Sequence, residues 1–309
     1  MVPVGSLNAP GVRTAPGTRA TSHGARRLLT VDIGNTHIVL GVFLDGRLSA
    51  HWRLASAHAR TIDESWVMLS MLFQSAGLEA RELDGVAIAS VVPDLNFVWI
   101  KLAEYHLQLE PFVMRPGAPG TPEVRLPDPS TVGADRLCNA AAVWHLVRRA
   151  AIVVDFGTAT TFDVIHSDGA FLGGLILPGP QTALRNLHQS AALLPKVALA
   201  FPPRVIGVTT EQAMQSGLLH GAVAQVEGLV ERIRHELAES GVPGPVSVFS
   251  TGGFGRIMAR HTPVIEEHLP YLVLCGLALC HARSTGGPEL EPQEIRANRL
   301  PAPEAGVEE

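Results

Sequence analysis

The sequence TVDIGNTHIV at residues 30–39 decides the fold. An apolar run ends at Asp32, an Asp-x-Gly loop follows, and a second apolar run begins at Ile38. An apolar run that stops at a short polar, glycine-containing segment is typical of a β-strand followed by a turn. We therefore predict strands at residues 28–31 and 38–43, and the Asp-Gly pair at 45–46 predicts a hairpin into a third strand at 48–54.

The same order of features returns 123 residues later, since Asp155 − Asp32 is 155 − 32 = 123. The stretch VVDFGTATTFDV at residues 153–164 again places an Asp-x-Gly loop between two apolar runs, and a Ser-Asp-Gly turn at 167–169 leads to a third. A repeat of domain length predicts a duplicated α/β protein with a ligand cleft between its halves. The predicted halves are residues 28–150 and 151–283. Helices are predicted at 62–76, 96–105, 182–193, 210–239 and 272–281, and apolar residues at helical spacing from 137 to 147 predict a further helix that starts near residues 135–136.

The composition is that of a globular protein, with 46% apolar and 17% charged residues in a chain of 309. A net charge of −5 argues against a dedicated nucleic-acid-binding protein. No apolar run reaches the roughly 18 residues that a membrane span requires. The three cysteines lack metal-ligand spacing and are expected to be buried thiols of a cytoplasmic protein. Residues 1–27 are expected to be a disordered leader, and residues 284–309 a disordered acidic tail.

The two loops have the residue types that a phosphate site needs. Gly34 permits close approach of the backbone to a phosphate, and Asn35 and Thr36 add side-chain donors. Asp32 suits a Mg²⁺ ion carried by ATP, because this ion prefers one or two carboxylates together with phosphates. One such loop alone would be explained better by an ordinary turn, but a matched pair favours phosphoryl transfer, which depends on positioning and charge neutralisation. No P-loop motif is present.

Two further motifs each leave an alternative open. The sequence GADR at residues 133–136 precedes a helical pattern, so that Asp135 could accept the proton of an attacking hydroxyl and Arg136 could bind a carboxylate or phosphate. The alternative is a surface pair in which Asp135 caps the helix. The sequence TGG at residues 251–253 fits either close approach of an adenine ring or a tight strand-to-helix turn.

Taken together, these motifs resemble those of the ASKHA superfamily (actin, sugar kinases and Hsp70) and, within it, the type III pantothenate kinases. The resemblance extends over residues 28–283, and its most specific stretches are TVDIGNTHIV, GADR, VVDFGTATTFDV, GGLILPG and EQAMQSG. It implies a duplicated ribonuclease-H-like fold with a central cleft, a homodimer, and transfer of phosphate from ATP to pantothenate, the first step of coenzyme A biosynthesis.

The resemblance also implies a role for individual residues. Asp135 would be the catalytic proton acceptor, Asp155 would bind a monovalent cation (K⁺ or NH₄⁺), and Asp32 would bind Mg²⁺ through ATP. Pantothenate would contact Gly133, Ala134, Asp135, Arg136 and Thr210. ATP would contact Asp32, Ile33, Gly34, Asn35, Thr36, His37, Ile38, Val39 and Thr158.

The chain departs from the family pattern around the expected acceptor pocket. Leu126 stands where the family usually has Tyr, Pro127-Asp128 where it has Asp-Asn, Thr131 where it has Glu, and Thr209 where it has Asn. Loss of the Tyr hydroxyl removes a hydrogen bond to pantothenate and predicts weaker binding. The alternatives are a kinase of another small hydroxyl compound or of a phosphate polymer, and a non-catalytic regulator with the same fold.

Overall fold

The structure is a computed structural model that describes residues 26–191 and 194–297. Its first half contains a sheet of order β3-β2-β1-β4-β5. Strands β1 (Arg27–Ile33), β2 (His37–Leu44) and β3 (Arg47–Ala55) are antiparallel, while β4 (Gly85–Ser90) and β5 (Phe112–Val113) continue the sheet in parallel. The three predicted strands of this half are therefore present, and β1 begins one residue before its predicted start.

The second half repeats this arrangement. Its strands are β6 (Ala151–Phe156), β7 (Ala159–Ile165), β8 (Phe171–Pro178), β9 (Ser247–Thr251) and β10 (Glu267–His268). They form a sheet of order β10-β9-β6-β7-β8, which matches the first sheet strand for strand when β6 is aligned with β1. The predicted duplicated α/β fold is confirmed.

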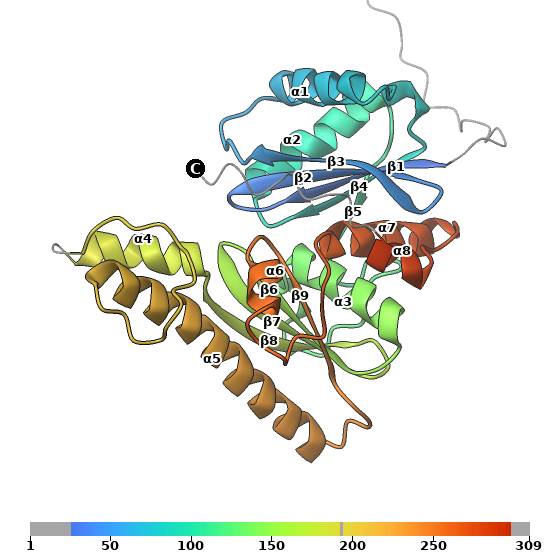
Figure 1. The fold of residues 1–309 in the computed structure, drawn as a ribbon. Helices are drawn as coiled ribbons and strands as arrows, with labels where there is room; N and C mark the ends of the chain where they lie inside the picture. Colours follow the sequence, from blue (N-terminus) through green and yellow to red (C-terminus); the bar gives the residue numbers. More distant parts are fainter. Residues whose placement is uncertain (1–25, 192–193, 298–309) are drawn as a thin grey trace, which may run out of the picture.

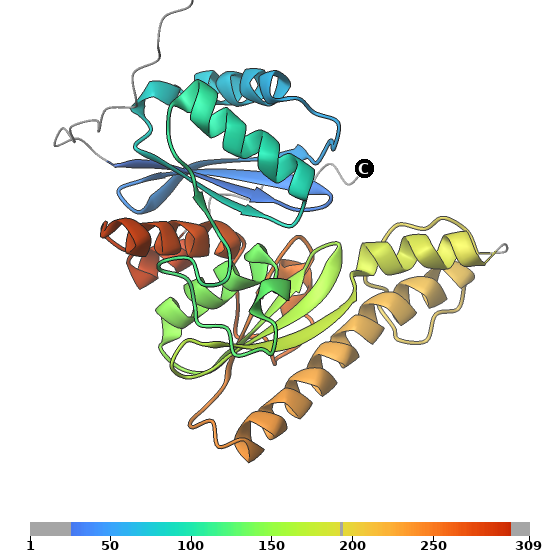
Figure 2. The same ribbon diagram turned by 180° about the vertical axis from the view of Figure 1, so that it is seen from behind.

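The helices form three layers around the two sheets (Figures 1 and 2). Helices α1 (Ile62–Ser75) and α2 (Pro93–Leu102) cover the outer face of the first sheet, and α5 (Thr210–Glu239) and α6 (Gly255–Ala259) cover the outer face of the second. Helix α4 (Pro180–Ser190) lies beside α5. Helices α3 (Ala134–Val147) and α7 (Leu272–Thr285) lie between the sheets, with α8 (Pro292–Ala297) beside them. Within the described ranges, every helix is too short or too polar to span a bilayer.

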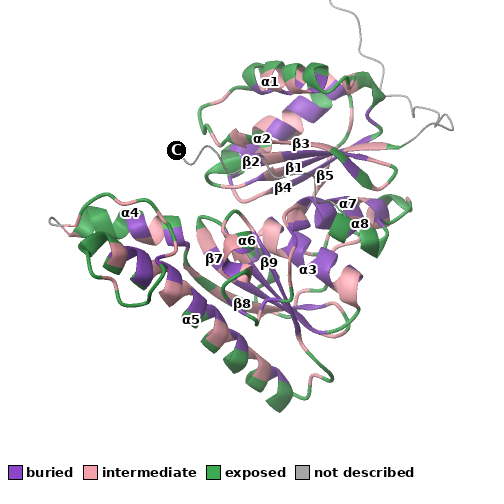
Figure 3. Ribbon diagram, in the orientation of Figure 1, coloured by how far each residue is buried: buried purple, intermediate pink, exposed green. Residues whose placement is uncertain are grey.

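Alternation along the central strands turns both loop aspartates toward the middle layer. On β1, Leu29, Val31 and Ile33 pack against α1 and α2, so Asp32 faces the opposite side. On β6, Ile152, Val154 and Phe156 pack against α5 and α6, so Asp155 faces the first half. Figure 3 shows the buried residues concentrated on these strands and on the helices between the sheets. The two aspartates therefore face the middle layer from opposite sheets, close enough for the charge of Asp155 to raise the pKa of Asp32.

The two halves are linked in the middle layer, because α3 and α7 each pack on the sheet of the other half. Helix α3 precedes the second sheet in the sequence yet packs on β6 and β7 as well as on β4, and α7 follows the second sheet yet packs on β1, β2 and β4. The helices approach so closely that a Cβ atom at Gly276 would lie 1.9 Å from the carbonyl oxygen of Cys138. The halves therefore share one core, although their sequences divide near residue 150.

The prediction of a solvated tail from residue 284 is wrong for residues 284–297. Helix α7 continues to Thr285, and beyond it Leu290 and Ile295 are buried in the core of the middle layer. The buried imidazole of His145 on α3 hydrogen-bonds through Nε2 to the Leu290 carbonyl at 2.7 Å. Two apolar residues five positions apart in an acidic segment give no periodic pattern, so the sequence did not indicate this docking. Residues 298–309 and the predicted leader up to residue 25 lie outside the described residues.

The contact between α3 and α7 predicts a large effect of a small substitution. We expect Gly276→Ala to lower the free energy of unfolding by about 1–3 kcal/mol, because the added methyl group forces the helices apart. The matched control is Gly228→Ala on α5, where a Cβ atom would meet no atom within 4 Å. It should stabilise the protein by roughly 0.5–1 kcal/mol through helix propensity alone. Equal urea midpoints for the two variants would contradict the packing argument.

Candidate active site

The two Asp-x-Gly loops meet at their threonine residues. Each loop is closed by a hydrogen bond of 3.0 Å, from Gly34 N to the His37 carbonyl and from Gly157 N to the Ala159 carbonyl. The hydroxyls of Thr36 and Thr158, 122 residues apart in the sequence, are 2.9 Å from each other. Both threonines are exposed, so the tips of the loops form one polar surface.

The residues expected to hold ATP divide into two groups. Asp32 and Gly34 are partly buried, and Asn35, Thr36 and His37 are exposed at the loop, so all five can face a ligand in the cleft. Ile33 and Ile38 are fully buried in the outer core with α1 and α2. Val39 packs against the middle layer. The last three can therefore contribute only backbone groups or packing to a nucleotide site.

The GADR motif forms the start of α3. Gly133 is the N-cap, and the Asp135 carboxylate accepts a hydrogen bond of 2.9 Å from the Arg136 backbone N–H. A Cβ atom at Gly133 would lie 2.5 Å from Asp135 Oδ1, so a larger residue here would displace the carboxylate from its present position. Asp135 does not occupy the N-cap position that the alternative assigned to it. It lies in the first turn, where backbone N–H groups stabilise an anion.

Burial and mutual repulsion raise the pKa of the carboxyl groups in the cleft. Burial raises the pKa of Asp32 well above its usual range, and the negative charges of Asp135 and Asp155 add to this effect. Burial, followed by Asp135 and Asp163, raises the pKa of Asp155 to about 7. Burial also raises the pKa of Asp135, although its contacts with Arg136 oppose the shift. A cation entering the cleft would stabilise the ionised forms of these groups.

Among the described residues, however, no group of three or more His, Cys, Asp or Glu side chains is arranged to hold a metal ion. The carboxylates lie close enough to affect one another's pKa without forming a closed set of ligands.

Two polar residues of the site were missed by sequence reasoning. Asp163 on β7 and Asn139 on α3 are both buried and hydrogen-bond to each other, and Asn139 also reaches Asp155. A signal was present, because Asp163 interrupts an apolar strand and Asn139 interrupts the apolar face of a helix. A polar residue at a core position is unfavourable unless it is paired, so its occurrence indicates a partner in the fold.

The TGG motif forms the tight turn that was one of its two interpretations, and the approach of an adenine ring stays a prediction. Gly252 has a φ of +80°, and a Cβ atom there would lie 2.4 Å from Asp155 Oδ1. Glycine is therefore required for the tight turn and for room beside the second loop. A Cβ atom at Gly253 would meet nothing within 4 Å, so this position faces open space next to the cleft.

Three of the residues that differ from the family pattern make contacts with neighbouring residues. Leu126 packs against the middle layer and lies 3.3 Å from the position of a Cβ atom on Gly173. Asp128 accepts hydrogen bonds from the Ser130 N–H and hydroxyl, which start the short 3₁₀ helix Pro129–Thr131. Thr209 caps α5 by accepting from Gln212 N at 3.2 Å.

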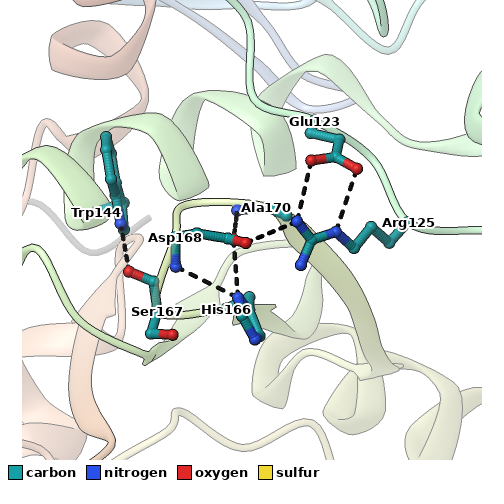
Figure 4. A network of polar contacts seen from close by, with 7 residues as sticks. All are labelled: Glu123, Arg125, Trp144, His166, Ser167, Asp168 and Ala170. Carbon is teal, nitrogen blue, oxygen red and sulfur yellow. Dashed lines mark hydrogen bonds and ion pairs between the residues drawn. The ribbon is translucent and has the colours of Figure 1, made fainter. Parts of the chain in front are cut away.

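A polar network fastens the segment that leads into the GADR motif (Figure 4). Arg125 binds Glu123 on its own segment and Asp168 in the β7–β8 turn, at 2.7 Å from the latter. Asp168 also contacts His166, and Trp144 of α3 donates to the Ser167 carbonyl at 3.0 Å. These contacts fix the backbone immediately before Leu126 to the second sheet.

Thr210 stands apart from the other residues predicted to contact pantothenate. It begins α5, which packs against α4 on the outer side of the second half (Figure 1). The structure brings together Gly133, Ala134, Asp135 and Arg136 but does not bring Thr210 of the same chain to them.

Comparisons with known proteins agree with this geometry. Residues 28–232 match the family model described as type III pantothenate kinase. A type III pantothenate kinase of Moorella thermoacetica is 42% identical over 258 residues, which cover 84% of this chain and 100% of the relative. One from Thermomicrobium roseum is 43% identical over 256 residues, covering 83% and 97%.

A solved structure shares the fold at low sequence identity. It is described as a conserved putative Baf family transcriptional activator from Campylobacter jejuni and superposes with a TM-score of 0.52 at 19% identity, covering 84% of this chain and 99% of its own. At this identity the likeness concerns the fold alone. The family model and the two relatives decide the assignment: the chain belongs to the type III pantothenate kinase family.

Proposed function

We propose that this protein transfers the γ-phosphoryl group of ATP to the primary hydroxyl of pantothenate, the first step of coenzyme A biosynthesis. The observation that carries the proposal is the meeting of two acidic phosphate loops, joined at Thr36 and Thr158, beside the helix start that presents Asp135. Together with membership of the family, this geometry favours a kinase over a non-catalytic regulator, because the chain carries Asp32, Asp135, Asp155 and both loops.

Asp135 is the group best placed to accept the proton of the acceptor hydroxyl. Burial raises its pKa, which makes the carboxylate a stronger base than an exposed aspartate, while the first turn of α3 and Arg136 keep it ionised. The backbone N–H groups of the two loops, with Asn35 and Thr36, bind and orient the phosphates from opposite sides. Arg136 binds the carboxylate of pantothenate at the other end of the acceptor.

The donor set of the cleft fits the cations that the family implies. Asp32 would hold Mg²⁺ through the ATP phosphates, and Asp155 would hold the monovalent cation. The raised pKa of both carboxyl groups and the buried Oδ1 of Asn139, which has no hydrogen-bond partner among the described residues, support a cation at this position. When bound, these ions neutralise charge that develops on the transferring phosphoryl group.

We further propose that the protein is a homodimer in the cytoplasm. Val205, Ile206 and Val208 form an exposed apolar segment immediately before Thr210, and the side chains of Ile206 and Val208 are each 82% exposed. An apolar surface of this kind marks an interface. A second subunit seated there would explain how Thr210, which is remote from Asp135 in its own chain, reaches pantothenate: it would contact the partner's acceptor site. The three free, buried cysteines fit a reducing compartment.

The first prediction concerns the proton acceptor. Asp135→Asn should lower kcat for pantothenate by about 10²–10⁴-fold, because the amide cannot accept the proton. ATP affinity measured by calorimetry should stay near that of the wild type. Formation of ADP and of phosphopantothenate, followed by a coupled assay and by mass spectrometry, reports the reaction. Asp94→Asn, at the exposed start of α2, is the control and should be fully active. Normal turnover by the Asp135 variant would remove this residue from the mechanism.

The second prediction concerns the monovalent cation. Replacing K⁺ by tetramethylammonium at constant ionic strength should remove most of the activity, and NH₄⁺ should restore it. Asp155→Asn should abolish this response, because it removes the negative charge that holds the ion. The rate at several K⁺ concentrations, measured for wild type and variant, is the readout. A rate that does not change with the cation would contradict the assignment of Asp155.

The third prediction concerns the dimer. The double substitution Ile206→Asp and Val208→Asp should give a monomer in sedimentation velocity, because two charges would be buried in the interface. The same variant should bind pantothenate more weakly, since Thr210 would no longer reach a partner. The control is Val67→Asp with Met71→Asp, an equally apolar exposed pair on α1, which should remain dimeric. Dimers from both variants would locate the interface elsewhere.

A further inference from the structure

The guanidinium of Arg136 is held on three sides. Its Nε donates to Asp163 Oδ1 at 2.5 Å, and its Nη2 donates to the Phe162 carbonyl at 3.0 Å. The group also lies over the Phe171 ring, with Cζ 5.2 Å from the ring centre. The Nε atom thus donates within the protein. Within residues 26–191 and 194–297, Nη1 and the second N–H of Nη2 have no hydrogen-bond acceptor, so this end of the group is available to a ligand.

Glycine in β8 makes room for this arrangement. Gly174 has a φ of +153°, and a Cβ atom at this position would lie 2.8 Å from Arg136 Nη2 and still closer to the Phe162 carbonyl. In the sheet, Asp163 of β7 is paired with Gly174 of β8. The Arg136 side chain therefore crosses β8 at a glycine, which leaves space because it has no side chain.

The partner of Arg136 is a carboxylate without exposure to solvent. Asp163 is 0% exposed and projects from β7 into the middle layer. A fully buried carboxylate destabilises a protein unless it is paired and hydrogen-bonded. Its pairing with Arg136 satisfies one oxygen, and the other oxygen accepts from Asn139 Nδ2 at 3.2 Å.

Asn139 extends this network to the nucleotide side of the cleft. Its side chain is buried, and the same Nδ2 atom lies 3.5 Å from Asp155 Oδ2. One amide group therefore connects the carboxylate that holds Arg136 with the carboxylate of the second phosphate loop.

We infer that Asp163 and Asn139 are positioning residues. Asp163 fixes Arg136 with its free end facing the acceptor, and Asn139 connects this pair to Asp155 in the second phosphate loop. This inference rests on the proposed function, in which Arg136 binds the carboxylate of pantothenate. In this view Asp163 determines specificity for an acidic acceptor, because it holds the Arg136 side chain in one extended conformation. The carboxylate of the acceptor then binds a guanidinium group that is already in position.

The test compares two acceptors that differ only at the acidic end. Pantothenol carries a hydroxymethyl group in place of the carboxylate of pantothenate, and both have the same reacting hydroxyl. Asp163→Asn removes the negative charge with little change in shape and releases Arg136. We expect kcat/KM for pantothenate to fall about tenfold or more, which is the loss of one charge-assisted contact. For pantothenol kcat/KM should change little, and ATP affinity measured by calorimetry should be retained.

The control is Glu104→Gln, which breaks the Lys101–Glu104 ion pair on the surface of the first half. It should leave the preference for pantothenate over pantothenol unchanged. An equal loss for both acceptors in Asp163→Asn would overturn the inference, because a general structural defect has no reason to discriminate between them. If the wild type phosphorylates neither acceptor, the proposed function itself fails and the inference fails with it.

A second variant covers the case in which Asp163→Asn does not fold, as judged by circular dichroism. Arg136→Lys keeps the positive charge but lacks Nε and the planar group that contacts Asp163 and Phe171. We expect it to lose the preference for pantothenate by a similar factor. A folded Arg136→Lys enzyme with the preference of the wild type would show that the fixed orientation of the arginine is unimportant.

Discussion

The close packing of α3 on α7 is the constraint on which the rest of the structure depends. These helices fill the layer between the two sheets, and the backbone contact between Gly276 and Cys138 leaves no room for a side chain. Because β1 and β6 lie on opposite sides of this layer, its thickness sets the separation of Asp32 and Asp155. The start of α3 also places Asp135 at the same edge. The geometry of the candidate site is therefore a consequence of core packing, and the loops do not set it alone.

The second determinant of the site is charge. Several carboxyl groups share a partly buried cleft, and Arg136 is the cation that directly pairs with one of them. Such a cluster is unfavourable in the empty protein, since each negative charge raises the pKa of its neighbours. Under the proposed function, a nucleotide that carries a metal ion would bring positive charge to this cluster and relieve the repulsion.

Much of this fold could be predicted from the sequence, because it depends on short sequence patterns that occur in both halves. The runs around Asp32 and Asp155 encode strand, loop and strand within about fifteen residues, and their repetition indicated the duplication. The start of α3 followed from GADR and the helical pattern after it. The exchange of α3 and α7, the docking of Leu290 and the link from Asp163 through Asn139 depend on contacts between residues far apart in the sequence. No periodic pattern in one segment reports such contacts.

The exchange of helices has a consequence for how the chain folds during synthesis. The inner face of the first sheet is covered by α7, which begins at Leu272, so the ribosome must make nearly the whole protein before that face can be enclosed. Until then, the inner face of the first sheet, where Phe43, Ala87 and Ala89 belong to the middle core, remains open to water or to other chains. A nascent chain stalled before residue 272 should therefore bind a general chaperone more strongly than a completed one, whatever the state of its second sheet.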